Sequence, residues 1–282
     1  MLHLESLEQL RKTRRQWSQQ GSVVAFVPTM GNLHEGHLQL VDAAKKLADK
    51  VIVSIYVNPL QFGANEDLDK YPRTLAADMQ ALTARGADAV FTPDTGLIYP
   101  RGLSEQTYVE VPHLSDILCG ASRPGHFRGV ATIVCKLFNM VQPDHAVFGK
   151  KDYQQLMVIR LMAEDLSLPV SIHGIETIRA NDGLALSSRN GYLSDHEHKQ
   201  ATSVYRAMQQ IAEALQSGRK DFSTLENDAK LLLKANGFTP DYVSIRRQHD
   251  LAPAADHDHQ LVILVAAYLG KTRLIDNLEV SC

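Results

Sequence analysis

The sequence predicts an α/β protein in which a doubly wound parallel sheet is followed by a small α+β domain. Three observations carry this prediction. Short β-branched apolar runs alternate with helical patterns through residue 176, which indicates βαβ units. The runs are apolar at nearly every position, as expected for strands that helices cover on both faces. After residue 194 the pattern changes to polar helices and then to further strand-like segments.

The first domain is expected to span residues 1–176. Residues 1–21 are charged and amphipathic and predict a helix, and they lack the apolar run and cleavage site of a signal peptide. The elements that follow are expected as alternating strands and helices at 23–27, 36–49, 51–57, 74–85, 89–92, 130–141, 145–148, 152–165 and near residue 170.

The second domain is expected to span residues 177–282. Its predicted helices lie at 195–216 and 222–235, and its predicted strands at 242–245, 261–267 and 273–275. The segment 179–191 contains Asn-Asp-Gly, two serines and two arginines, which is typical of a polar loop between domains.

Composition excludes several classes of function. The chain of 282 residues has 29 Lys and Arg against 32 Asp and Glu, a formal net charge of −3, which disfavours a nucleic-acid partner. The cysteines Cys119, Cys135 and Cys282 form no CxxC pair and fit a reducing compartment. No apolar stretch reaches the roughly 18 residues that a membrane span needs. We therefore expect a cytoplasmic globular protein with no membrane partner.

The segment 28–37, PTMGNLHEGH, is the first candidate for chemistry, because it joins the first predicted strand to the first helix. Open α/β sheets bind ligands there, and a helix N-terminus offers N–H groups to a phosphate. Gly31 and Gly36 allow a close backbone approach, and His34 and His37 face one side if the first helical turn includes both. The alternatives are a capped loop with solvated histidines, or a zinc site for which no nearby side chain completes three ligands.

Three further segments lie at comparable places. In 148–155, FGKKDYQQ, a lysine could stabilise phosphoryl charge at a strand end; in 186–189, LSSR, two hydroxyls and a guanidinium could hold terminal phosphates. Each alone is typical of a surface turn. The amides of Asn58 and Gln61 follow the second strand and suit an uncharged hydroxylated ligand. The turn 123–129, RPGHFRG, adds two arginines and a histidine, with a tightly packed loop as the alternative.

The ordered set PTMGNLHEGH, NPLQF, RPGHFRG, FGKKDYQQ, DGLALSSRN and LVAAYLGKTRLIDN resembles the pantothenate synthetase (pantoate–β-alanine ligase) family. The matches extend from about residue 28 to residue 277. The resemblance implies a Rossmann-like fold of the HxGH nucleotidyl-transferring type. It implies that (R)-pantoate and β-alanine condense with ATP through a pantoyl adenylate, releasing AMP and pyrophosphate on the route to coenzyme A. It also implies dependence on Mg²⁺ and a cytoplasmic homodimer.

The resemblance also implies residue roles. His34, His37 and Lys151 are the expected catalytic residues, with His37 as a candidate acid and Lys151 on the α-phosphate. Gln61 and Gln155 are expected to bind the hydroxyls of pantoate. No residue is assigned to a metal, and the 187–189 loop is the candidate closing element. The expected ATP-binding set is Met30, Gly31, Asn32, Leu33, His34, Glu35, Gly36, His37, Gly149, Lys150, Lys151, Asp152, Ile178, Leu186, Ser187, Ser188 and Arg189.

Two positions depart from the family pattern, and one enzyme class is the main alternative. At the position of Lys150, family members often have Glu or Gln. At the position of Cys119, they often have an acidic residue. A cytidylyltransferase would share the HxGH turn but would need more basic residues for a phosphorylated acceptor, and the pair Gln61 and Gln155 argues against it. A non-catalytic nucleotide-binding protein would not need polar residues at several strand ends.

Overall fold

The structure is a computed structural model that describes residues 1–63 and 66–282. The chain forms two compact units, Met1–Gly149 with Val158–Ile175, and Lys150–Met157 with Glu176–Cys282. The expected boundary at residue 176 placed all of 150–157 in the first domain, whereas these residues belong to the second unit. The reason is a long-range contact, because Asn277 binds the backbone carbonyls of Lys150 and Lys151.

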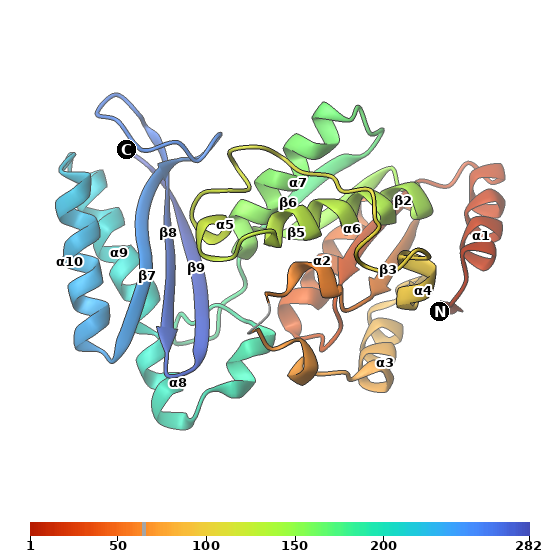
Figure 1. The fold of residues 1–282 in the computed structure, drawn as a ribbon, viewed down its shortest axis with the longest axis horizontal. Helices are drawn as coiled ribbons and strands as arrows, with labels where there is room; N and C mark the ends of the chain where they lie inside the picture. Colours follow the sequence, from red (N-terminus) through yellow and green to blue (C-terminus); the bar gives the residue numbers. More distant parts are fainter. Residues whose placement is uncertain (64–65) are drawn as a thin grey trace. The chain divides into compact units, whose positions relative to one another are not determined.

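The first unit contains a six-stranded sheet with parallel pairing throughout (Figure 1). Its spatial order is β1-β4-β3-β2-β5-β6, formed by β1 (Leu2–Leu4), β2 (Val24–Thr29), β3 (Lys50–Ile55), β4 (Ala89–Phe91), β5 (His145–Gly149) and β6 (Ser171–Ile175). The order reverses between β2 and β5, which makes their carboxyl ends the topological switch point of the sheet. The predicted fold class is confirmed.

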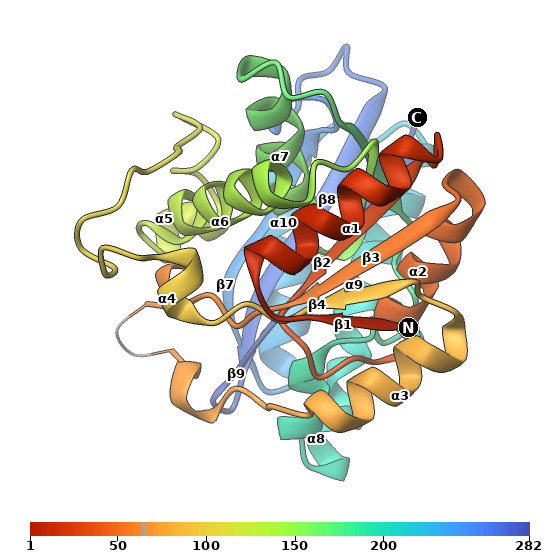
Figure 2. The same ribbon diagram turned by 90° about the vertical axis from the view of Figure 1, so that its right-hand side faces the viewer.

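Helices cover both faces of this sheet. The helices of this unit are α1 (Leu7–Gln19), α2 (Glu35–Leu47), α3 (Leu75–Arg85), α4 (Thr95–Ile98), α5 (Cys119–Ser122), α6 (His126–Val141) and the part of α7 (Tyr153–Asp165) from Val158 on, with 3₁₀ turns η1 (Pro59–Gln61) and η2 (Leu68–Lys70). The turn η3 (Lys150–Asp152) and the first residues of α7 belong to the second unit. On one face Val27 and Val53 pack with Val41 of α2 and Leu82 of α3. Figure 2 shows α1 beside α6 on the opposite face.

The opposite face is built on aromatic contacts. Phe138 of α6 packs edge-on against Phe26 of β2 and Phe148 of β5, with ring centroids 6.4 and 6.3 Å apart. Alternate residues of each strand thus enter two separate cores. This double burial explains why the strands read as continuous apolar runs.

Two helices of the first unit are present as expected but start at other residues than expected. The N-terminal segment begins with β1, an edge strand, and α1 starts only after Ser6, whose side chain forms a capping box with Gln9. Three residues are too few to show a strand pattern, and β1 is defined by pairing with β4. The helix expected from 130 begins at His126, because Gly125 enters it with a positive φ of 79°.

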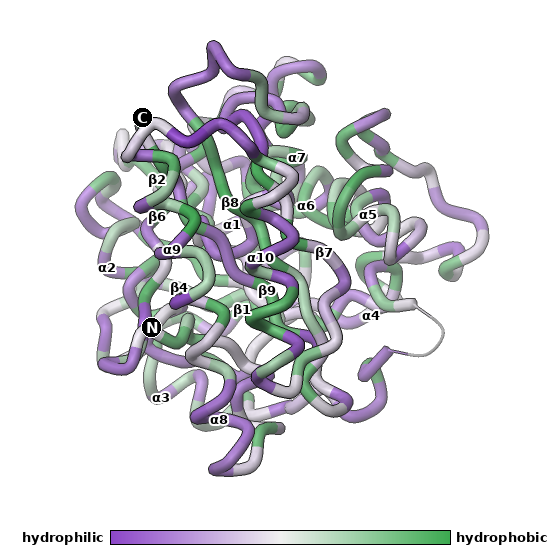
Figure 3. The backbone as a smooth tube through the Cα atoms, turned by 90° about the vertical axis from the view of Figure 1, so that its left-hand side faces the viewer, coloured by the Kyte–Doolittle hydropathy of each residue, from purple (hydrophilic) through white to green (hydrophobic). Residues whose placement is uncertain are grey.

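The second unit pairs a three-stranded antiparallel sheet with helices. Its elements are η4 (Ser188–Tyr192), α8 (Asp195–Ala201), α9 (Ser203–Gln216), α10 (Phe222–Ala235), β7 (Phe238–Arg247), β8 (Gln260–Leu269) and β9 (Thr272–Ser281). Figure 3 shows β8 as a largely hydrophobic strand, and Met208, Leu233 and Ile263 lie in the core between helices and sheet. The single helix expected at 195–216 is two helices that meet at Thr202.

Within the described ranges 1–63 and 66–282, no helix has the length and apolar character of a membrane span. The three cysteines all lie in these ranges and form no disulfide, and Cys119 is buried.

Candidate active site

The turn after β2 is shaped by Gly31. Its φ is +81°, and a Cβ added there would lie 3.0 Å from Cγ2 of Ile55 and 3.1 Å from Oδ2 of Asp78. Its amide donates to the hydroxyl of Thr29 at 3.2 Å. A side chain at this position would therefore be both strained and crowded, which fixes glycine in the motif.

Asp78 of α3 holds the next two residues of the turn. The buried carboxylate accepts the Asn32 amide on Oδ2 at 3.0 Å and the Leu33 amide on Oδ1 at 2.8 Å. Thr74 donates to the same carboxylate at 3.2 Å. The amides of Asn32 and Leu33 are therefore committed to Asp78, which fixes the backbone just before the start of α2. Sequence reasoning missed Asp78 because it lies 46 residues along the chain.

The two histidines of the turn meet where α2 begins. The ring centroids of His34 and His37 are 4.1 Å apart. His34 lies just outside the helix as its N-cap; its Nδ1 accepts the Gly36 amide at 3.1 Å, while its own amide donates to Nδ1 of His37 at 3.4 Å. An Nδ1 that accepts an N–H carries no proton. Each neutral ring therefore carries its proton on Nε2, the atom that can donate to a phosphate oxygen.

Glu35 does not bring a free carboxylate to this turn. Its oxygens accept from Nη2 of Arg85 at 2.5 and 2.6 Å, and the Arg85 hydrogen bond holds the pKa of Glu35 below its ordinary value. Nη1 of Arg85 also binds Asp42 at 2.6 Å. The Glu35 carboxylate is thus bound to Arg85, the last residue of α3. Within the expected ATP set, Glu35 is thus a helix-start residue whose charge is neutralised.

Gln61 is linked directly to the histidine turn. Its Nε2 donates to Sδ of Met30 at 3.3 Å, and its Oε1 accepts from Nδ2 of Asn58 at 3.1 Å. Asn58 is buried and its other contacts fix it: it donates to the Gly129 carbonyl at 3.2 Å and accepts from Tyr99 at 2.7 Å. The amide of Gln61 is therefore oriented without a ligand, and it belongs to the same site as the HxGH turn.

In the second unit, the two neighbouring lysines of η3 have different surroundings. Nζ of Lys150 lies 2.5 Å from Glu176 and 2.7 Å from Glu279. Burial opposes the charged form of Lys150, but the hydrogen bonds to the two carboxylates outweigh it and raise its pKa. The Lys150 ammonium is thus held in an ion-pair cluster, and Lys151, which is half-buried, is the candidate for phosphate chemistry.

Asn277 of β9 holds the backbone of this turn. Its Nδ2 donates to the carbonyls of Lys150 at 2.9 Å and Lys151 at 2.8 Å. The first helical turn that follows is anchored as well, because the hydroxyl of Tyr153 donates to Glu279 at 3.0 Å. Gln155 is half-buried in α7, and Asp152 is exposed at the end of η3. The position of Lys151 is therefore set by a strand more than a hundred residues away.

A second buried group of β9, Asp276, holds the hairpin that leads to the serine loop. Arg179 makes a two-point contact with it, at 2.6 and 2.9 Å, and lies 3.9 Å over the ring of Tyr205. Burial raises the pKa of Asp276, and Arg179 opposes that rise. Gly183 makes the turn with a φ of +91°, and a Cβ there would lie 2.6 Å from Tyr205. Only glycine fits this hairpin.

The serine loop follows directly. The Leu186 amide donates to the Ile178 carbonyl at 2.9 Å and closes the hairpin. Ser187 caps η4 by accepting the Arg189 amide at 3.2 Å, and Asn190 donates to the Ala185 carbonyl at 3.0 Å. The stretch Ser187, Ser188 and Arg189 thus starts a short turn fixed to the hairpin by Asn190.

The predicted residues therefore divide between the units. Met30 to His37, Gln61 and Gly149 belong to the first unit; Lys150 to Asp152, Gln155, Ile178 and Leu186 to Arg189 belong to the second. Sequence reasoning missed Asp78, Asp276 and Asn277. The segment LVAAYLGKTRLIDN was part of the resemblance, but its sequence does not indicate which groups Asp276 and Asn277 bind.

A model of the family described as pantoate-beta-alanine ligase matches residues 3–279. The chain belongs to the pantoate-beta-alanine ligase family. The predicted resemblance is confirmed, and the protein is an enzyme of the ligase class. Membership in this family supports the condensation of pantoate with β-alanine.

Curated relatives and solved structures of the same family match this chain over nearly its full length. The ligase is 62% identical over 278 residues to a pantothenate synthetase of Idiomarina loihiensis, covering 99% of this chain and 97% of that protein. It is 59% identical to one of Shewanella loihica, with 99% of each covered. The pantothenate synthetase structure from Thermus thermophilus has a TM-score of 0.93 at 42% identity and 100% coverage of both chains.

A further solved structure carries ligands. It is the pantoate-beta-alanine ligase of Francisella tularensis complexed with beta-gamma ATP and beta-alanine. The TM-score is 0.80 at 35% identity, with 99% of this chain and 97% of that chain covered.

Proposed function

We propose that this ligase condenses (R)-pantoate with β-alanine at the expense of ATP, through a pantoyl adenylate, and releases AMP and pyrophosphate. The observation that carries the proposal is the contact between Gln61 and Met30. It joins an oriented neutral amide, suited to a hydroxylated acid, to a turn with two imidazole Nε2–H donors, suited to phosphate. The Francisella tularensis relative complexed with ATP and β-alanine supports the choice of substrates.

The two-step route follows from the chemistry of the acid. An amine that attacked the carboxylate carbon directly would have to displace oxide, which is too poor a leaving group at neutral pH. The carboxylate must therefore be activated first. In the first step the pantoate carboxylate attacks the α-phosphorus of ATP and pyrophosphate leaves. In the second, the β-alanine amine attacks the carbonyl carbon of the mixed anhydride, loses a proton, and AMP departs. No cysteine nucleophile is needed.

The residues take roles that match their surroundings. Nε2–H of His34 and of His37 would donate hydrogen bonds to phosphate oxygens, and Lys151 would stabilise charge on the α-phosphate. The acid role implied for His37 would need a second proton, on Nδ1, because only the imidazolium is an acid near neutral pH. Gln61 and Gln155 would bind the hydroxyls of pantoate. The expected phosphate role of Ser187, Ser188 and Arg189, and of their loop as a closing element, stays part of the proposal.

Magnesium fits this site only as an ion held largely by the nucleotide. Among the residues described, no group of three or more His, Cys, Asp or Glu side chains is placed to hold a metal. Mg²⁺ commonly binds through substrate phosphates and one or two carboxylates, where it neutralises phosphate charge. Of the two acidic residues in the expected ATP set, Glu35 is paired with Arg85, which leaves the exposed Asp152 as the candidate protein contact.

The homodimer and the cytoplasmic location implied by the resemblance also belong to this proposal. Sedimentation of the purified protein tests the first, and fractionation of cells tests the second.

Isotope exchange tests the reaction. Labelled pyrophosphate should exchange into ATP when pantoate is present and β-alanine is absent, because adenylate formation is complete before the amine enters. Exchange that required β-alanine would contradict the adenylate route. Failure to form AMP with ATP and both acids present would contradict the reaction itself.

A further inference from the structure

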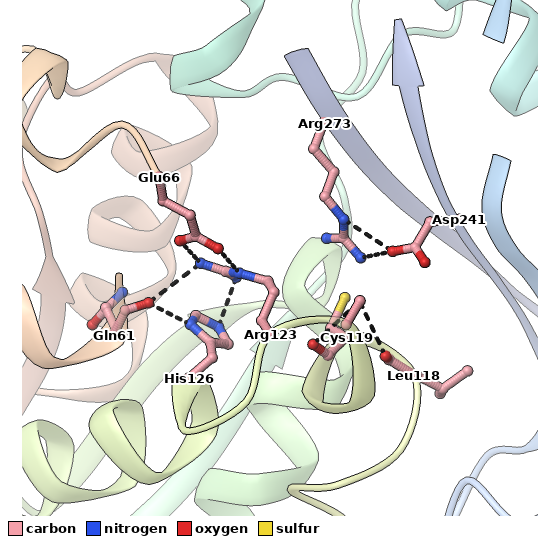
Figure 4. A network of polar contacts seen from close by, with 9 residues as sticks. Gln61, Glu66, Leu118, Cys119, Arg123, His126, Asp241 and Arg273 are labelled. Atoms are coloured by element: carbon pink, nitrogen blue, oxygen red, sulfur yellow. Dashed lines mark hydrogen bonds and ion pairs between the residues drawn. The ribbon is translucent and has the colours of Figure 1, made fainter. Parts of the chain in front are cut away.

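The backbone carbonyl of Gln61 is held by two side chains from the segment that starts α6. His126 donates from Nδ1 to this oxygen at 2.7 Å, and Arg123 donates from Nη2 at 3.3 Å (Figure 4). Glu66 in turn accepts from Nε and Nη2 of Arg123, both at 2.6 Å. We call Arg123, His126 and Glu66 the carbonyl clamp.

The hydrogen bonds of the clamp specify one protonation state. A carbonyl can only accept, so Nδ1 of His126 carries a proton. A guanidinium can only donate, and Nη1 of Arg123 lies 3.0 Å from Nε2 of His126, so that nitrogen is the acceptor. His126 is therefore a neutral Nδ1–H tautomer, opposite to the Nε2–H tautomer of His34 and His37.

Charge in the clamp is balanced internally. The side chains of Arg123 and Glu66 are only 17% and 25% exposed. Burial would raise the pKa of Glu66, but the hydrogen bonds from Arg123 outweigh it and hold that pKa below its ordinary value. A two-point pair of this kind fixes the plane of the guanidinium. Arg123 is therefore engaged as an oriented donor and does not present an unpaired positive charge.

The backbone of η1 is also packed closely against α6. A Cβ added to Gly129 would lie 2.3 Å from the Leu60 carbonyl oxygen and 2.8 Å from the amide nitrogen of Gln61. Asn58 donates to the carbonyl of the same glycine. The main chain of Gln61 is thus fixed on its amide side by Gly129 and on its carbonyl side by the clamp.

We propose that Arg123, His126 and Glu66 are positioning residues that set pantoate specificity by fixing the main chain from which the Gln61 amide projects. This inference rests on the proposed function, because it takes Gln61 to bind the pantoate hydroxyls. A side-chain amide discriminates between a hydroxyl and its absence only if it is held within hydrogen-bonding geometry. Loosening the clamp therefore weakens pantoate recognition and leaves the histidine turn in place.

The experiment compares clamp variants with a matched control. Glu66→Gln, Arg123→Lys, His126→Ala and His126→Asn loosen the clamp to different degrees. Lys50→Met is the control, because it removes a partly buried ion pair with Asp88 at the opposite end of β3, 3.0 Å long and 33% and 27% exposed. Each protein is assayed for KM and kcat with pantoate and with an analogue that lacks one hydroxyl, and for ATP Kd by calorimetry.

The clamp predicts a specific pattern. Arg123→Lys and His126→Ala should raise the pantoate KM by about tenfold and reduce the preference for pantoate over the deoxy analogue by a similar factor. The Kd for ATP should stay within about threefold of the parent. His126→Asn should recover part of the preference, because its amide N–H can replace the Nδ1 donor. Glu66→Gln, which keeps one acceptor, should show the smallest change.

A physical readout accompanies the kinetics. The ¹⁵N shifts of the His126 ring should report the Nδ1–H tautomer in the parent and in Lys50→Met, and should change in Arg123→Lys.

Three outcomes overturn the inference, and they are distinguishable from failure of the proposed function. An active parent whose folded clamp variants keep full preference for pantoate, or lose ATP affinity in equal measure, removes the clamp from substrate recognition. An Nε2–H tautomer at His126 contradicts the hydrogen-bond assignment on which the clamp is built. A parent that makes no AMP from pantoate and β-alanine fails at the earlier step and overturns both proposals.

Discussion

The HxGH turn and the η3 turn both connect a parallel strand to a helix, yet they hold their polar groups differently. In the HxGH turn, the Nδ1 atoms of His34 and His37 accept from backbone amides two to three residues away. In η3, Lys150 and Lys151 are held by Asn277, which is 127 and 126 residues away. The two histidines of the first turn are held by hydrogen bonds within the turn, and Asp78 of α3 holds the residues just before them. The backbone of the second turn is held by a strand distant in sequence.

The same contrast separates the two lysines of η3. They are neighbours in sequence, but only the surroundings decide that Lys150 pairs with Glu176 and Glu279. Two carboxylates balance the positive charge of the Lys150 ammonium, so its attraction for a phosphate is weakened. The ion pairs of Lys150 therefore favour Lys151 for the proposed phosphate role.

The largest expected effect comes from substitutions that test the difference between Lys150 and Lys151. Lys151→Ala should lower kcat by about 10²-fold, equivalent to about 2.7 kcal/mol, because a charge that stabilises the reacting phosphorus is lost. His37→Ala should fall in the same range. Lys150→Met should leave kcat within a few-fold and lower the melting temperature instead. Steady-state kinetics and thermal unfolding of all three variants check this, and equal kcat losses at 150 and 151 would contradict the assignment.

A smaller effect is expected at the group that organises the HxGH turn. Asp78→Asn replaces one of two accepting oxygens by an NH₂ group that faces an amide N–H, which should cost about 1–3 kcal/mol of unfolding free energy. The ATP Kd should weaken while the preference for pantoate over its deoxy analogue is kept. Urea unfolding and calorimetry measure the two quantities. Asp42→Asn, on the α2 pair with Arg85, is the surface control; a larger loss there would show that Asp78 is not the anchor.

The smallest effect concerns pH and the Lys150 cluster. Because the folded-state pKa of Lys150 is raised above its ordinary value, its ion pairs stabilise the protein below about pH 10.5. That stability is lost as the pH rises through the folded-state pKa. The difference in unfolding free energy between the parent and Lys150→Met should therefore shrink above that pH, by at most about 1 kcal/mol for a partly exposed cluster. A difference that is constant from pH 8 to 11 would contradict it.

How much was predictable varies along the chain. The strands β2, β3 and β5 were predicted because burial on both faces makes them apolar at nearly every position. The strand β1 was missed because three residues on an edge carry no period, and only pairing with β4 defines it. The break at Thr202 was missed because both flanking segments are helical and the polar pattern continues across it.

Within the site, the chain by itself determined the identity of the reactive groups and where they occur: two histidines three apart after a strand, a lysine pair after another, and amides suited to an uncharged acceptor. Those are local patterns, and local hydrogen bonds and strand burial enforce them. Only the tertiary structure decided which lysine is neutralised, that Asp78 occupies the amides of the HxGH turn, and that a carbonyl clamp holds Gln61. Each of these depends on partners from elements distant in sequence, and a single sequence does not say which side chains will meet.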